Sequence, residues 1–203
     1  MSFFPPDPDM PEIEDDEPVI EPRWQAPEDE LPTLLPVSQI IAATDYVAIA
    51  LVGVSVYSSG VKLRLKRYLR RHDLSPRDWN EVSNLFMEYG VMGASPDPGG
   101  RLRFGLVLAD GTKILADPGH GFFGAQEPHR EEITVMHQHG GGGGGSRQYT
   151  QSDGLWLWPT PPDGPIELVL QWPSLGIAET HITIDGSRLS ALAQQATPLW
   201  EKP

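Results

Sequence analysis

The sequence predicts a mainly β fold, an antiparallel β-sandwich or open barrel of about eight strands with one or two short helices. Glycine and proline each occur 21 times in 203 residues, so about a fifth of the chain favours turns and linkers. Short apolar segments, some with strict period-two alternation, are separated by these turn signals. Only two segments have the three-to-four-residue spacing of an amphipathic helix.

The first predicted hairpin begins in the apolar run 46–57. This run is shorter than the roughly 20 residues that a membrane-spanning helix needs, and its β-branched residues predict a buried strand. Ser58, Ser59 and Gly60 form the expected turn. The following strand alternates apolar and basic residues, which places three cations on one outer stripe: Lys62, Arg64 and Lys66.

Two helices are expected. Ser75 is a good N-cap before Pro76, and Asp78 completes a pattern similar to a capping box, so we predict a helix over 76–89 that ends at Gly90. A terminal helix is predicted over 187–196, with Asp185 as its cap.

The remaining strands are predicted from short apolar runs. Asp110-Gly111 between two such runs is a strong hairpin signal, because a type I′ turn needs positive φ at both central residues. Glycine loses the most backbone freedom on ordering, so we predict a flexible polyglycine loop at 140–145. The other expected strands are 101–109, 112–116, 132–138, 155–158, 166–172 and 177–184.

The N-terminal segment differs in composition from the rest. Residues 1–30 contain 11 of the 28 acidic residues and one of the 15 basic ones, so they carry −10 of the net charge of −13. Prolines and the scarcity of branched apolar residues predict a disordered acidic tail over 1–34. We expect a single β-rich domain over 35–203.

Composition also narrows the function classes. The absence of cysteine excludes disulfides, thiolate zinc sites and cysteine nucleophiles, and it fits a reducing cytoplasm. The first residues lack the basic start of a secretion signal, and we expect no membrane segment. Neither G-x-S-x-G nor H-E-x-x-H occurs, so the expectation favours a non-catalytic protein without a cofactor.

The C-terminal third has a distinctive succession of motifs. After the glycines come W-x-W-P at 156–159, P-P-x-G-P at 161–165 and W-P-x-x-G-I-x-E at 172–179, and F-G-L-V-L-A-D-G at 104–111 accompanies them. This succession resembles an uncharacterised family of bacterial proteins with a polyglycine loop. That family has no established activity, so the resemblance implies no chemistry. It also implies that the histidines before the glycines lie outside the shared pattern.

Basic residues around the first hairpin form one candidate site for an anion or for the acidic tail. The candidate residues are Lys62, Arg64, Lys66, Arg67, Arg70 and Arg71. Three alternatives stay open: a solvated face, intramolecular docking of the tail, or an external anionic partner such as nucleic acid. The low isoelectric point of about 4.7 weighs against nucleic acid.

Two further pairs are candidates. His137 and His139 stand two apart in a predicted strand, so both imidazoles share a face, as in a metal site, although the sequence favours a solvated strand end that leads into a loop. Trp156 and Trp158 also share a face, and would form a recognition surface if exposed or core if both sides of the sheet are covered.

The sequence therefore predicts a cytoplasmic interaction or binding module whose acidic tail and basic hairpin modulate contact with a macromolecular partner, with a protein favoured over nucleic acid. A small metal- or ligand-dependent enzyme that uses the His-x-His pair is the first alternative. A structural subunit of a larger assembly is the second.

Overall fold

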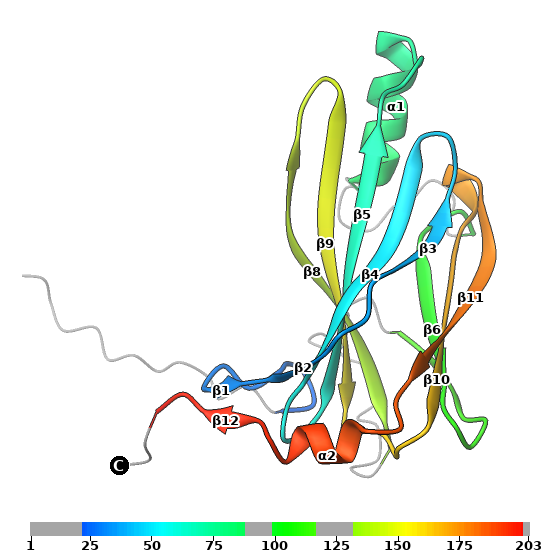
Figure 1. The fold of residues 1–203 in the computed structure, drawn as a ribbon. Coiled ribbons are helices and arrows are strands. Elements are labelled where there is room, and N and C mark those ends of the chain that lie inside the picture. The colour runs from blue at the N-terminus through cyan, green and yellow to red at the C-terminus, as the bar shows by residue number, and fades with distance from the viewer. Residues whose placement is uncertain (1–21, 88–98, 117–131, 201–203) are drawn as a thin grey trace, which may run out of the picture.

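The computed structural model describes residues 22–87, 99–116 and 132–200. Two antiparallel sheets pack face to face, with α1 (Pro76–Phe86) at one end of the sandwich and α2 (Leu189–Ala193) at the other (Figure 1). The predicted class, a mainly β sandwich with two short helices, is confirmed.

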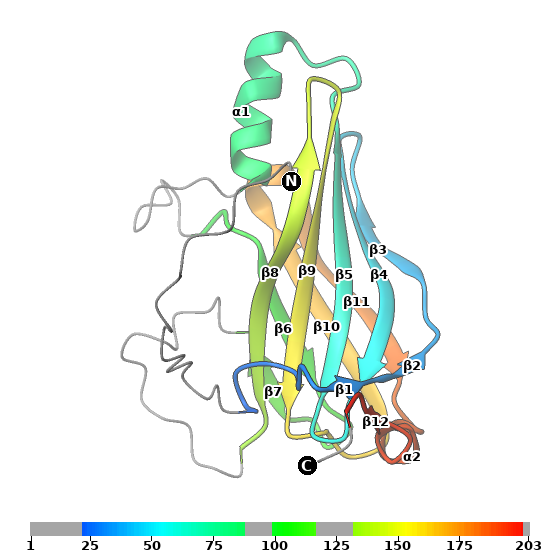
Figure 2. The same ribbon diagram turned by 90° about the vertical axis from the view of Figure 1, so that its left-hand side faces the viewer.

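The larger sheet has the strand order β2-β4-β5-β9-β8, and β3 also pairs with β4. Its strands are β2 (Thr33–Leu35), β3 (Gln39–Ala43), β4 (Val47–Val56), β5 (Val61–Arg70), β8 (Thr134–Gly144) and β9 (Gln148–Trp158). The order β4-β5-β9-β8 is visible edge to edge in Figure 2.

The smaller sheet has the order β11-β10-β6-β7 and covers the inner face of the larger one (Figure 2). Its strands are β6 (Arg103–Val107), β7 (Lys113–Leu115), β10 (Pro165–Trp172) and β11 (Ile177–Asp185). A short 3-10 helix, η2 (Pro173–Leu175), joins β10 to β11. A two-stranded sheet of β1 (Glu30–Leu31) and β12 (Thr197–Pro198) lies beside the sandwich.

The core follows directly from period-two alternation. On β5 every second residue from Val61 to Leu69 is buried, and on β10 every second residue from Ile166 to Trp172 is buried. Facing residues of the two sheets fill one continuous apolar cluster. The predicted hairpin β4–β5 and the β6–β7 hairpin around Asp110-Gly111 are both present. The predicted type I′ turn is wrong, because Gly111 has a positive φ of 86° and Asp110 does not.

Helix α1 begins at the predicted residue, whereas α2 is shorter than the predicted 187–196 at both ends. The Oγ atom of Ser75 accepts a hydrogen bond from the backbone N–H of Asp78, at 3.2 Å, and Pro76 is the first helical residue. The end predicted at Gly90 lies outside the described residues. In α2 the N-cap is Arg188, because Asp185 accepts from the N–H of Ser187 in a turn before the helix.

The prediction of a polyglycine loop is wrong. Strand β8 continues through Gly144, and Gly142, Gly143 and Gly144 pair with Gln151, Thr150 and Tyr149 of β9. A Cβ atom on Gly142 or Gly144 would collide with β9, whereas one on Gly143 would meet open space. Ladder hydrogen bonds and this close approach override the low strand propensity of glycine.

The predicted tail, residues 1–34, is too long at its C-terminal end. Residues 22–34 were expected to be disordered, but β1 lies within them and β2 begins there, and these strands pair with β12 and β4. The acidic residues before position 22 lie outside the described residues.

Candidate functional site

A polar cluster interrupts the apolar interior of the sandwich. Arg67 on β5 points inward with 1% of its surface exposed, and its Nε and Nη2 atoms donate to the two carboxylate oxygens of Asp153 on β9 at 2.7 and 3.2 Å. The guanidinium also donates to the backbone oxygen of Phe86, at 3.2 Å. This two-point geometry lets the guanidinium and the carboxylate neutralise each other.

Two histidines of β8 complete the cluster. Nε2 of His137 lies 3.0 Å from Oδ1 of Asp153, and Nδ1 of His139 lies 3.4 Å from the same oxygen. His137 is buried, whereas the side chain of His139 is 49% exposed. The cluster therefore extends from the core to the surface, where the imidazole of His139 is exposed to solvent.

The electrostatics of Asp153 reflect these neighbours. Burial raises the pKa of its carboxyl group. Hydrogen bonds from His137 and His139, together with the charge of Arg67, outweigh burial and hold the pKa well below its usual range. Asp153 is therefore an ionised carboxylate inside the fold.

Aromatic rings pack against the polar cluster. The guanidinium carbon of Arg67 lies 5.5 Å from the ring centre of Phe86 and 5.1 Å from that of Trp172, so the cation is held against both rings. The ring of Phe104, from the opposite sheet, meets His137 edge-on at 4.9 Å. Both sheets and α1 thus fix the positions of the polar groups.

A groove lies on the outer face of the larger sheet and borders the polar cluster, because His139 and Asp153 are among its lining residues. Its volume is about 1130 Å³, and its basic lining residues are Lys62, Arg64 and Lys66 of β5. Burial, and then the charge of Arg64, lower the pKa of Lys62 below its usual value. Three cations therefore lie together on the outer face of β5 although the chain as a whole is acidic.

Residues 22–30 cross this outer face, and we call them the strap (Figure 2). Nε1 of Trp156 donates to the backbone oxygen of Pro22 at 2.9 Å, and the side-chain amide of Gln138 donates to that of Trp24 at 3.2 Å. Glu28 and Glu30 line the groove together with the three cations. At the end of the strap Glu30 accepts from the N–H of Ser58, at 2.6 Å.

The predicted basic site divides into separate parts. Lys62, Arg64 and Lys66 share the groove, as alternation along β5 predicts. Arg67 was wrongly placed with them, because it lies on the buried side of β5.

The other two predicted cations lie at the end of the hairpin. The Nε atom of Arg70 donates to the backbone oxygen of Asp45, at 2.7 Å. That of Arg71 donates to the backbone oxygen of Leu74, at 3.0 Å.

The tryptophan pair is not an exposed recognition surface. Trp156 is fully buried under the strap and meets Tyr57 edge-on at 5.6 Å. Trp158 is half-buried. The outer face of β9 is covered here by residues that the sequence assigned to a disordered tail.

The key residues that sequence reasoning missed are Asp153 and the inward role of Arg67. Asp153 has the same strand parity as the buried Leu155 and Leu157, and Arg67 the same parity as Leu65 and Leu69. The available signal was a single charged residue on each of two otherwise apolar strand faces, basic on β5 and acidic on β9. Buried charges need a partner, so the two residues could have been paired.

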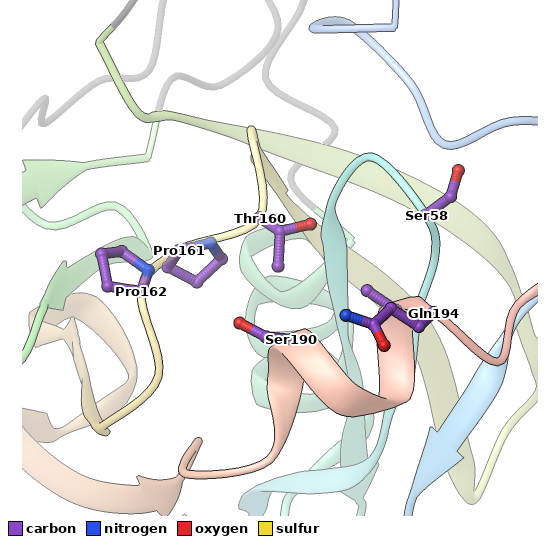
Figure 3. A pocket seen from close by; sticks show the side chains of 7 residues that line it. Ser58, Thr160, Pro161, Pro162, Ser190 and Gln194 are labelled. Atoms are coloured by element: carbon purple, nitrogen blue, oxygen red, sulfur yellow. The ribbon is translucent and has the colours of Figure 1, made fainter.

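A second hollow of about 500 Å³ lies between the β4–β5 turn, residues 160–162 and α2 (Figure 3). Ser58, Thr160, Ser190 and Gln194 line it, and Figure 3 shows the two labelled prolines beside Thr160. Of the described residues that line it none is charged, and this hollow provides neither an acid–base pair nor a metal ligand set.

The fold and these sites define an antiparallel β-sandwich with a polar cluster between its sheets and a basic groove on one face. No family model, curated protein or solved structure matches the chain. Among the described residues, no helix has both the length and the apolar character needed to cross a bilayer.

Proposed function

We propose that this protein is a binding module whose basic groove receives an acidic segment of a protein partner and whose own acidic N-terminal segment competes for that groove. The observation that carries the proposal is the strap, whose two glutamates line the groove together with Lys62, Arg64 and Lys66. The proposal also keeps the cytoplasm as the location of the module, on the ground that the chain has no cysteine.

The competition follows from tethering. Residues 1–21 carry eight acidic and no basic side chains. They join the strap at Pro22, whose backbone oxygen accepts a hydrogen bond from Trp156. A short flexible tether gives an effective concentration on the order of millimolar, so even a weak ion pair is populated within the molecule. A partner must therefore displace the chain's own carboxylates.

The groove has the right charge for an acidic peptide. The cations of Lys62 and Arg64 repel each other, and a carboxylate between them relieves this repulsion. Burial of Lys62 increases the free energy gained when the carboxylate binds. Attraction of this kind is weakened by salt over a Debye length of about 8 Å at physiological ionic strength. Binding is thus expected to be strongest at low salt.

The test uses full-length protein with the eight carboxylates of residues 1–21 changed to amides. A fluorescent peptide corresponding to residues 1–21 serves as the acidic probe, and a single-stranded DNA oligonucleotide serves as the nucleic-acid probe. We expect the amide variant to bind the peptide at low salt and the unmodified protein to bind it at least about tenfold more weakly, because its own segment occupies the groove.

Two variants locate the binding. Lys62→Gln with Arg64→Gln removes groove charge and should abolish peptide binding, whereas Lys113→Gln removes an exposed cation of the other sheet and should not. Failure of the amide variant to bind the peptide at low salt would reject the proposal. Tighter binding of the DNA than of the peptide would identify nucleic acid as the partner class instead.

A further inference from the structure

The polar cluster contains a set of metal ligands, two of which, His139 and Asp153, also line the groove. His137, His139 and Asp153 each present one ligand atom, and these atoms all lie within 4.8 Å of one another. Two imidazoles with one carboxylate is a donor set that suits divalent first-row transition ions. The cluster joins two adjacent strands, so the sheet itself sets the spacing of the ligands.

The separations are close to those around a bound ion. Zinc bonds of about 2.0–2.1 Å in tetrahedral geometry place neighbouring donor atoms roughly 3.3 Å apart. The two His–Asp separations are 3.0 and 3.4 Å. The ligand atoms of the two imidazoles also lie within 4.8 Å of each other, and His139 is the half-exposed member of the set.

Neighbouring groups hold two ligands in place before any ion arrives. Arg67 binds the carboxylate of Asp153 at two points and so fixes its orientation. The ring of Phe104 fixes the plane of His137. Orienting partners of this kind are a regular part of metal sites.

The charge of Arg67 decides which ion is suitable. A hard cation such as Mg²⁺ or Ca²⁺ depends on several anionic oxygens, and here one carboxylate is already shared with a guanidinium. An ion that gains most of its binding energy from neutral imidazole nitrogens is less affected. Because of the same charge, we expect the affinity for the ion to be moderate and lower than that of a structural zinc site.

We propose that His137, His139 and Asp153 bind one zinc ion, with His139 closing the site from the solvent side and a coordination position left open. Entry occurs past the exposed imidazole of His139. Arg67 acts as a positioning residue, since it contacts the carboxylate and not the ion.

The test is calorimetric titration of the full chain, freed of metal, with zinc chloride, and a parallel titration with cobalt chloride followed by visible absorption. We expect one ion per chain and the intense d–d bands of four-coordinate cobalt. His139→Ala, a change at an exposed side chain, should weaken zinc binding at least about tenfold, the lower end of what even an orienting partner contributes.

His181→Ala is the matched control, because His181 lies beside Glu167 and Glu179 and is the other described histidine next to carboxylates. It should bind zinc as the unmodified chain does. His137→Gln, checked for folding by circular dichroism, should lose binding as His139→Ala does. No saturable binding at micromolar zinc, unchanged binding by His139→Ala, or loss of binding in His181→Ala would each overturn the proposal.

Discussion

Arg67 and Asp153 stand 86 positions apart in the sequence, yet their side chains form a two-point ion pair in which Nε and Oδ2 are separated by 2.7 Å. The pair lies between the sheets with the guanidinium against Phe86 and Trp172. It therefore connects β5, β9, β10 and the end of α1. A buried pair of this kind is weak evidence for stability but makes the fold sensitive to the loss of either partner.

Removing one partner should be costly. Asp153→Asn leaves the charge of Arg67 buried and uncompensated, so we expect a loss of about 3–5 kcal/mol in the free energy of unfolding, measured by urea denaturation. The double variant Arg67→Met with Asp153→Leu replaces both charges with apolar groups and should recover most of that loss. A double variant less stable than Asp153→Asn would contradict this account.

The glycine strand offers a test in which adjacent residues should respond differently. A Cβ atom on Gly144 would overlap the backbone oxygen of Gln148 and the ring of Tyr149, whereas one on Gly143 meets nothing within 4 Å. We expect Gly144→Ala to cost about 1–3 kcal/mol. Gly143→Ala should be neutral or stabilising by up to about 1 kcal/mol, because alanine restricts the unfolded chain. Equal thermal melting temperatures for the two variants would show that β8 is not paired here.

His181 should titrate at unusually high pH. Hydrogen bonding to Glu179 raises its pKa, partial burial lowers it, and Glu167 raises it again, with a net increase. The protonated imidazole therefore stabilises the fold below the ordinary histidine pKa of about 6.5, and this contribution disappears as pH rises through the folded value.

An NMR titration of the His181 ring protons measures this shift directly. Glu179→Gln should bring the pKa back toward about 6.5. Glu132→Gln, at an acidic residue outside the groups that shift the pKa of His181, provides the control. A pKa that does not respond to Glu179→Gln would remove the proposed cause.

The N-terminus of α1 depends on its cap. Ser75 accepts from the N–H of Asp78 and donates to its carboxylate at 2.7 Å. Ser75→Ala should lower the free energy of unfolding by about 1 kcal/mol, and Ser75→Thr should keep most of it. Urea denaturation of the two variants compares them, and an equal loss in both would mean that the hydroxyl does not cap the helix.

The sequence was most informative where structure is local. The hairpin β4–β5, the Asp110-Gly111 turn and the start of α1 all follow from alternation, turn chemistry and capping within a few residues. These features need no knowledge of distant parts of the chain.

Features that depend on distant residues were missed for that reason. The inward side chain of Arg67 is stable only because Asp153 lies opposite, and no local rule names that partner. Gly142 and Gly144 form a strand because β9 approaches closely enough to exclude a side chain. The strap is ordered through bonds to Gln138 and Trp156, more than 110 positions away.

Strand β8 has one more residue than β9 between His139 and Gly142, and this β-bulge affects how the edge of the sheet can meet another molecule. In the described part of the chain β8 is an edge strand, paired only with β9, and edge strands offer unpaired backbone groups to other chains. Glycines add no side chains to obstruct such pairing. The irregular register between His139 and Gly142 twists the edge and divides it into two short pieces. An eleven-residue edge that would otherwise favour aggregation is thereby made a poor template for strand addition.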